Sequence, residues 1–235
     1  MIHDDLEQRT PAWHLMRATR VGGSQASAVV STGRNGKETV GRRDLRVTMA
    51  LARLGYPPAI DTYTNADMAR GVALEPVAIR AWEMMSGLRA DTVGYCTSES
   101  ETYAGCSPDA IVGKDGVLEV KAPRAALHLA YIQLGRKATP EGWGLLSVPP
   151  QYRPQVLHTL LITGREWLEW VSYCDAFPFS AQVLCVHIPR DETITQITQY
   201  GEALRSFLVD VDSTVSDIKL IVESSHDHGP APSYP

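Results

Sequence analysis

Two acidic side chains and a lysine stand close together in the middle of the chain, in a pattern that suits metal-assisted chemistry. Asp109 precedes a short apolar run at 110–112, and Glu119 and Lys121 belong to a second run that follows a turn at 114–116. If the two runs pair as a hairpin, Asp109 lies directly opposite Glu119, with Cβ atoms about 5 Å apart. Lys121 follows Glu119 by two residues, so both side chains share one face of the strand.

The hairpin predicts a metal site that would serve phosphodiester cleavage. Two carboxylates at that spacing repel each other unless a cation lies between them, and a hard divalent ion with oxygen ligands is the natural occupant. We expect Asp109 and Glu119 to hold Mg²⁺, with two ions as the expected number and Mn²⁺ as a substitute. The Val120 carbonyl is a further candidate ligand. Such ions polarise a phosphate and lower the pKa of bound water, while Lys121 would orient that water or neutralise developing charge. The alternative is a surface hairpin that binds nothing.

A second stretch, near the N-terminus, is a candidate phosphate site. Arg17 and Arg20 come just before Gly22-Gly23-Ser24, which is typical of a turn into a short helix at 25–30 with Ser24 as its N-cap. Free N–H groups at a helix N-terminus bind phosphate, and the two arginines would add positive charge. The same residues also fit a plain capped helix with exposed arginines, and the pattern alone does not separate the two interpretations.

Composition sets broad limits on the class of protein. The chain has 235 residues, of which 44% are hydrophobic and 21% are charged. These values predict a single domain at 1–223 that is large enough for a full hydrophobic core. No apolar run approaches the 18 residues of a membrane span, and the N-terminus lacks a signal-peptide pattern, so we expect a soluble cytoplasmic protein that does not contact membranes. The four cysteines form no Cys-x-x-Cys pair and are expected to be free, mostly buried thiols.

The distribution of charge is more informative than the net charge of −5. Residues 1–137 hold 17 of the 22 Lys and Arg residues but 15 of the 27 Asp and Glu residues. Residues 138–235 hold the other 5 Lys and Arg and 12 Asp and Glu residues, so this part of the chain is acidic. A surface that faces phosphate therefore belongs to the first part of the chain.

Hydrophobic periodicity predicts the elements that position these residues. We expect helices at 25–30, 39–54, 65–86, 124–134, 151–163 and 191–223, and strands at 88–97, 166–176 and 181–188 beside the hairpin. Pro76 implies a kink or a helix start within 65–86. The irregular 135–150 segment could close over a substrate, and the polar stretch 224–235 is expected to be a disordered tail. The order of elements indicates an α/β fold, a sheet core flanked by helices.

Several of these motifs, taken in order, resemble one known family. The relevant pieces are Ala12-Trp13-His14, the segment 17–24, the segment 71–75, Gly105-Cys106-Ser107-Pro108-Asp109, the segment 118–123 and Gln155-Val156-Leu157-His158. Together they resemble the lambda-type phage exonuclease, or YqaJ-like viral recombinase, family of the PD-(D/E)xK nuclease superfamily. The match extends from about Trp13 to about Ile188. It implies a restriction-endonuclease-like core with a central mixed β-sheet flanked by helices.

The resemblance also implies an activity and its partners. Family members are Mg²⁺-dependent exonucleases that degrade double-stranded DNA ends in the 5′-to-3′ direction and leave 3′ single strands. A companion single-strand annealing protein then pairs those strands, and the nuclease commonly forms a homotrimeric ring around DNA. The resemblance further implies a gene carried by a phage or a prophage, with the protein acting in the bacterial host cell.

The matching positions carry the family's roles onto this chain. Asp109 and Glu119 match metal ligands, Lys121 matches the catalytic lysine, and Glu75 matches an upstream helical acid near the metals. The positions that grip the 5′ phosphate are Arg17, Ser24 and Ser107, with Arg20 nearby. Gln155 matches the first glutamine of a Gln-x-Gln helix. The second falls on Leu157, where this chain departs from the family, and Gln151 lies one turn earlier as a replacement.

Two other functions fit part of the same pattern. One is a DNA-end-binding recombination accessory module that has lost activity, but the intact Asp109, Glu119 and Lys121 argue against it. The other is a structure-specific or restriction-type endonuclease of the same fold. The candidate phosphate residues Arg17 and Ser24 favour an enzyme that acts at DNA ends.

Overall fold

The fold contains two sheets and seven α-helices within the residues that the computed structural model describes, which are 2–4, 6, 8–59, 65–138 and 144–226. The smaller sheet is antiparallel and consists of β1 (Ile2–Asp4), β2 (Tyr95–Thr97) and β3 (Gly105–Cys106). The larger sheet has the order β4 (Ala110–Val112), β5 (Gly116–Lys121), β6 (Trp167–Tyr173) and β7 (Val183–Pro189). Only β5 and β6 run parallel, so the larger sheet is mixed.

Six of the seven α-helices in the described residues lie at predicted positions, and the first, α1 (Pro11–Ala18), was not predicted. The other six are α2 (Ala26–Val29), α3 (Val40–Arg53), α4 (Ala66–Ser86), α5 (Ala125–Ala138), α6 (Arg153–Thr163) and α7 (Ile194–His226). Local chemistry fixes several of their ends. Thr39 and Asn65 cap α3 and α4, since their side chains accept hydrogen bonds from the Arg42 and Met68 N–H groups. Gly87 ends α4 with a left-handed φ of 72° that suits glycine.

The hairpin has the predicted register. Ala110 pairs with Leu118 and Val112 with Gly116, and one further step along this ladder sets Asp109 opposite Glu119. The Asp109 N–H donates a hydrogen bond of 3.2 Å to the Leu118 carbonyl, which continues the pairing to the end of the strand. The turn at 113–115 therefore determines which acidic residues face each other.

The larger sheet is covered by helices on both faces. On one face, Leu168 and Trp170 of β6 belong to a core shared with Tyr131 of α5 and Leu160 of α6. On the other face, the alternate residues pack against α4, as the alternation of side chains along a strand requires. That second core contains Ala78, Ile79, Trp82, Ala110, Val112, Leu118, Val120, Val171 and Tyr173.

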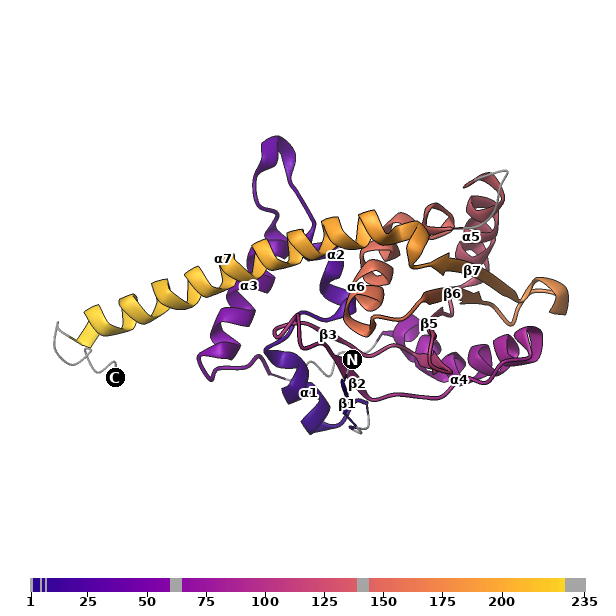
Figure 1. The fold of residues 1–235 in the computed structure, drawn as a ribbon, viewed down its shortest axis with the longest axis horizontal. Coiled ribbons are helices and arrows are strands. Elements are labelled where there is room, and N and C mark those ends of the chain that lie inside the picture. The colour runs from indigo at the N-terminus through magenta and orange to yellow at the C-terminus, as the bar shows by residue number, and fades with distance from the viewer. Residues whose placement is uncertain (1, 5, 7, 60–64, 139–143, 227–235) are drawn as a thin grey trace.

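A third core lies between the smaller sheet and the helices α2, α3, α6 and α7. It includes Met49 of α3, Cys106 of β3, Ile162 of α6, and Leu204 and Phe207 of α7. Helix α7 runs along the long axis of the molecule, and its C-terminal part extends beyond the rest of the fold (Figure 1). Helix α6 packs in both this core and the core above the larger sheet, so it connects the two sheets.

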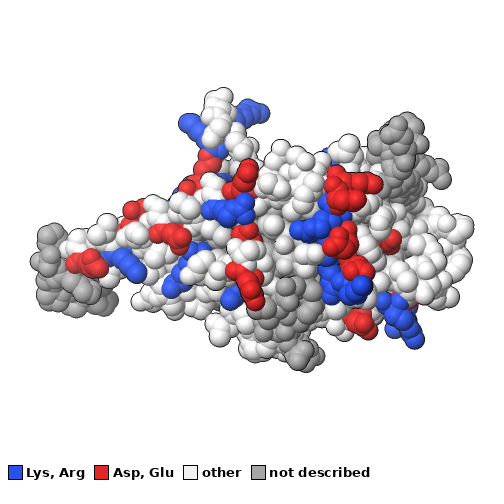
Figure 2. All heavy atoms as spheres, in the orientation of Figure 1, with Lys and Arg blue, Asp and Glu red and all other residues white. Residues whose placement is uncertain are grey.

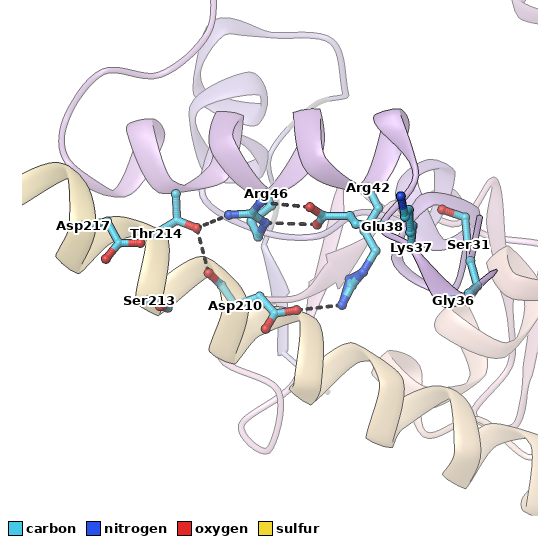
Figure 3. Close-up of a pocket in the computed structure, with 11 residues that line it drawn as sticks. Ser31, Gly36, Lys37, Glu38, Arg42, Arg46, Asp210, Ser213, Thr214 and Asp217 are labelled. Carbon is cyan, nitrogen blue, oxygen red and sulfur yellow. Dashed lines mark hydrogen bonds and ion pairs between the residues drawn. The ribbon is translucent and has the colours of Figure 1, made fainter. Parts of the chain in front are cut away.

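Polar contacts join helix α3 to α7 on one side and to the loop that precedes α3 on the other (Figure 3). Arg42 donates to Asp210 at 2.8 Å, and Arg46 donates to Glu38 at 2.9 Å and to Thr214. These residues line a hollow of about 370 Å³ together with the loop that holds the 3₁₀ turn η2 (Arg34–Gly36). The basic residues Arg42 and Arg46 of α3 are thus used in contacts to α7 and to the loop before α3.

The face of the molecule shown in Figure 2 has no large patch of only positive or only negative side chains. Figure 2 shows Lys and Arg interspersed with Asp and Glu along α7, with further basic side chains on the projecting loop at the top of the view. Within the described residues, no helix combines the length and apolar character that crossing a membrane requires. The four cysteines are free thiols, three of them buried.

Four local predictions differ from the structure. The strand expected at 88–97 is reduced to β2, and Asp91 forms only an isolated bridge with Ile111. Helix α4 continues through Pro76, so of the two predicted alternatives there, a kink or a helix start, the helix start is wrong. Helix α5 extends past 134 to Ala138, which shortens the expected irregular segment, of which residues 139–143 lie outside the described residues. Helix α7 continues to His226, beyond the expected end at 223, and residues 227–235 of the expected tail also lie outside them.

Candidate active site

A cavity of about 260 Å³ lies where the two sheets, α4 and α6 meet. The N-terminal segment and the 3₁₀ turn η1 (Gly23–Gln25) close one side, and the end of the β4–β5 hairpin closes the other. Most of the predicted site residues line this cavity. They are Arg17, Ser24, Glu75, Ser107, Asp109, Glu119, Lys121 and Gln155.

The hairpin acids are held by hydrogen bonds from the protein. The Val120 N–H donates to the Asp109 carboxylate at 2.5 Å, and the Lys121 ammonium donates to Glu119 Oε1 at 2.5 Å. The Gln155 amide of α6 donates to the same Glu119 oxygen. Glu119 is only 3% exposed, so a strand and a helix together fix its position.

Burial dominates the electrostatics of these groups. It raises the pKa of Glu119 to about 7, with Lys121 opposing the shift and Asp109 adding to it. It also raises the pKa of Asp109, with Lys121 as the main opposing charge. Burial by itself would lower the pKa of Lys121, but Glu119 and Asp109 outweigh it and the net shift is upward. Lys121 therefore stays a cation. Its single positive charge does not offset the burial of two carboxylates, so the pKa values of Asp109 and Glu119 remain raised.

Glu75 belongs to the same group of charges. Burial is the largest cause that raises its pKa, and the nearby Asp109 is the second. Arg9 donates to the Glu75 carboxylate at 3.4 Å. The third turn of α4 thus brings an acid from the far side of the sheet to the end of the hairpin.

The donor set fits a hard divalent cation in its chemistry. Asp109, Glu119 and Glu75 supply only oxygen ligands, and carboxylates with raised pKa values gain most from a nearby cation. As the side chains lie, no three His, Cys, Asp or Glu groups of the described part of the chain gather closely enough to surround an ion. Lys121 and Gln155 donate to Glu119 Oε1, and Arg9 donates to Glu75 Oε2, so one oxygen of each carboxylate is paired with a side chain of the protein.

The other end of the cavity is built around Arg17. Its guanidinium stacks over the Trp13 ring at 4.0 Å from the centroid, and the Trp13 Nε1–H donates to Ser107 Oγ at 2.9 Å. Among the described residues, no carboxylate pairs with Arg17, and burial lowers its pKa. A half-buried arginine without an acidic partner, beside two serines, is an arrangement that favours an anion.

Three sequence-based predictions at the site are not matched by the side-chain positions. Arg20 donates to the Met16 carbonyl at 3.0 Å and does not line the cavity. Gln151 also lies outside the cavity, where its amide donates to Tyr131 at 3.4 Å. Ser24 lines the cavity but is no N-cap, because the turn starts two residues earlier than expected and Gly22 is the cap of η1.

Leu157 points away from the site. Its side chain is partly buried against the two cores on either side of α6. Gln155 alone therefore supplies the amide contact from this helix to Glu119.

Several cavity residues were not singled out from the sequence. Gln8, Arg9, Trp13, Tyr95 and Thr159 also line the cavity. Arg9 has a left-handed φ of 70°, which is uncommon for a residue with a side chain. A signal was available only for Trp13, whose spacing of four residues from Arg17 places both on one face of α1.

Comparison with solved structures defines the class of fold. The alkaline exonuclease of Laribacter hongkongensis matches with a TM-score of 0.75 and 26% identity over 92% of this chain and 99% of that chain. Its complex with dAMP gives a TM-score of 0.76. A phage-related exonuclease from Haemophilus somnus, 16% identical, covers 87% of this chain and 99% of that chain with a TM-score of 0.58 and shows the fold alone. The fold is restriction-endonuclease-like, with the predicted mixed sheet flanked by helices.

The sequence identifies the family within that class. The model of the YqaJ-like viral recombinase domain matches residues 12–166, and the chain belongs to this family. The match covers the N-terminal cavity wall, α4, the hairpin and α6, so every predicted site residue lies within it. No curated protein sequence matches the chain.

Proposed function

We propose that this chain is a divalent-metal-dependent exonuclease that digests one strand of double-stranded DNA from its 5′ end and leaves a 3′ single strand. The observation that carries the proposal is the pairing of two sites in one cavity. An arginine without an acidic partner lies at one end and the Asp109, Glu119 and Lys121 group at the other. A terminal phosphate bound at the first would hold the nearby strand at the second. The match to an alkaline exonuclease at 26% identity supports the same activity.

In this proposal the cation is Mg²⁺, with two ions expected and Mn²⁺ as a substitute. Asp109, Glu119 and Glu75 would hold it, with the Val120 carbonyl as a further ligand. A bound divalent ion supplies charge neutralisation at the phosphate and a more acidic water. Lys121 and Gln155 both donate to Glu119 Oε1, so an ion would bind this carboxylate through Oε2 or displace one of the two donors.

The chain's own residues supply positioning and charge. Lys121 is cationic at neutral and alkaline pH, because the neighbouring carboxylates raise its pKa. Freed from Glu119, its ammonium would stabilise the negative charge that develops on the phosphate. Gln155 would hold the Glu119 carboxylate in orientation from α6. Arg17, Ser24 and Ser107 would bind the terminal phosphate and set which phosphodiester bond enters the site.

We further propose the partners that go with such an enzyme. The 3′ strand it leaves is a substrate for a single-strand annealing protein, and the two would act together in recombination in the cytoplasm of a bacterial host, encoded by a phage or prophage. A homotrimeric ring would keep the enzyme on the duplex. Family membership supports these proposals.

One experiment tests the proposed activity. Linear duplex with or without 5′ phosphates, and closed circular duplex, are incubated with the protein and Mg²⁺, and released nucleotides and nicked circles are measured. We expect nucleotides from the phosphorylated linear duplex, with 3′ single strands as the product, and no cutting of the circle. No release from the phosphorylated duplex would refute the proposal, and nicking of the circle would indicate an endonuclease instead.

A further inference from the structure

One polar group in the cavity wall has no partner. Tyr95 of β2 is fully buried, and its hydroxyl makes no hydrogen bond with any described residue. A buried hydroxyl without a hydrogen bond costs more free energy than a typical hydrogen bond contributes to stability. Most buried polar groups of native proteins are therefore hydrogen-bonded. Tyr95 lines the same cavity as Arg17 and Ser107.

The neighbouring strand makes room for this hydroxyl. A Cβ atom on Gly105 of β3 would lie 2.5 Å from the Tyr95 oxygen and 2.6 Å from its ring. The tyrosine therefore occupies the space that a side chain at 105 would fill. Gly105 is two residues before Ser107, so the Tyr95 ring is held beside the strand that leads directly to the cavity serine.

Charge at this point also favours an anion. Arg17 and Arg20 are near enough to the hydroxyl to oppose the upward shift that burial gives to its pKa. Because the net pKa shift of Tyr95 is upward, the hydroxyl keeps its proton at neutral and alkaline pH and can donate it. Two arginines and a protonated hydroxyl offer an anion charge and a hydrogen bond together.

We infer that the Tyr95 hydroxyl is a further ligand of the terminal 5′ phosphate, to which it donates a hydrogen bond beside Arg17. This inference rests on the proposed function and adds a binding residue to it. The hydroxyl is covered in the ligand-free arrangement, so a neighbouring side chain must shift as the phosphate enters. Arg17 is the side chain that we assign to this shift, because no polar partner among the described residues holds its guanidinium in place.

The test is Tyr95→Phe, which removes only the oxygen atom. Initial rates on 5′-phosphorylated and 5′-hydroxyl duplex give a preference ratio for each protein. We expect this ratio to fall about tenfold in Tyr95→Phe, because that is the usual effect of losing one hydrogen bond to a charged group. Because the Tyr95 oxygen makes no hydrogen bond with the described residues in the absence of ligand, the thermal midpoint of Tyr95→Phe should be equal to that of the wild type or higher. The matched control is Tyr173→Phe, a buried tyrosine of β6 in the core under α4, which should keep the wild-type ratio.

A second measurement does not depend on turnover. Inorganic phosphate should raise the thermal midpoint of the wild-type protein and raise it less in Tyr95→Phe. If the wild type prefers phosphorylated ends and Tyr95→Phe keeps that preference and the full phosphate effect, the inference is wrong and the proposed function stands. If the wild type digests phosphorylated and unphosphorylated ends equally, the inference is wrong, whereas the proposed function is refuted only if the phosphorylated duplex is not digested. A thermal midpoint that falls in Tyr95→Phe with an unchanged ratio would assign the hydroxyl a structural role and also overturn the inference.

Discussion

The Trp13 indole donates a 2.9 Å hydrogen bond to Ser107 Oγ, although the two residues are 94 positions apart. The same ring supports the Arg17 guanidinium on its face. One tryptophan thus contacts two groups of the candidate phosphate site, one from α1 and one from the strand that leads into the hairpin. The ring is nearly fully buried, which makes it a rigid support.

This contact leads to a prediction for Trp13→Phe. The variant keeps an aromatic ring under Arg17 but loses the donor to Ser107. We expect cleavage of 5′-phosphorylated duplex to fall about tenfold and the free energy of unfolding to fall by about 1 kcal/mol, the usual effect of one lost hydrogen bond. Trp167→Phe is the control, since Trp167 packs over Gly116 at the start of β5, outside the cavity. Equal losses of cleavage in both variants would contradict the assigned role.

Lys121→Ala should abolish most cleavage without unfolding the protein. The ammonium is placed to stabilise charge that develops in the transition state, and the loss of such a group lowers the rate by about 100-fold or more. Rates under single-turnover conditions and a circular dichroism spectrum check this. Lys114→Ala removes an exposed lysine from the hairpin turn and should leave the rate unchanged. A Lys121→Ala rate within a few-fold of wild type would remove the lysine from the mechanism.

The pH dependence of stability tests the burial of Glu119. Its pKa is raised to about 7 from 4.5, so the folded state binds a proton more tightly than the unfolded state. Its contribution to stability is full below pH 4.5 and is lost as the pH rises to about 7. In Glu119→Gln this loss disappears.

Denaturant unfolding at pH 5 and pH 8 without metal ions measures the difference. His158 opposes the effect, because burial lowers its pKa to about 4 and its contribution is lost as the pH falls. It does so equally in both proteins. Asp109 and Glu75, whose pKa values are also raised, titrate in both proteins too, so the comparison measures Glu119 together with its coupling to these two acids. A parallel pH dependence in wild type and Glu119→Gln would show that Glu119 does not titrate in this range. In the wild type, Mg²⁺ should stabilise more at pH 8 than at pH 5, since only the ionised carboxylate is a ligand.

Leu157→Gln restores the second glutamine of the family pattern but should not improve the enzyme. Leu157 packs in two cores and faces away from Glu119, so the new amide would be buried without a partner. We expect a loss of about 1–3 kcal/mol in unfolding free energy and no gain in cleavage rate. Gln155→Leu is the matched change on the same helix, and it should lower cleavage with a smaller effect on stability. A faster Leu157→Gln enzyme would show that α6 can present this position to the site.

Gly105→Ala should destabilise the protein through Tyr95. The new methyl group would lie within 2.6 Å of the tyrosine ring, and such overpacking costs about 1–3 kcal/mol. Thermal unfolding should show a large loss in Gly105→Ala, and the added substitution Tyr95→Leu should recover much of it. If the double variant is no more stable than Gly105→Ala alone, the clash lies elsewhere.

The sequence by itself determined the features that depend on neighbouring residues. The turn at 114–116 and the apolar runs beside it set the register, so Asp109 and Glu119 face each other as predicted. Capping residues Thr39 and Asn65 and the glycine at 87 set the ends of two helices, because these hydrogen bonds are local. The N-cap role of Ser24 and the length of the strand at 88–97 were predicted wrongly. Local propensity does not reveal where a turn starts or which part of a segment pairs with another strand.

The tertiary structure decided how the site is assembled. Arg9 meets Glu75 across 66 residues of chain, and Tyr95 fills the space left by a glycine on a neighbouring strand. Gln155 reaches Glu119 only because α6 packs between the two sheets. No spacing in the sequence encodes these contacts, because they depend on how the cores on either side of α6 pack together. The same packing turns Leu157 toward the core. Among the described residues it leaves Arg17 without an acidic partner and the Tyr95 hydroxyl without a hydrogen bond at the cavity.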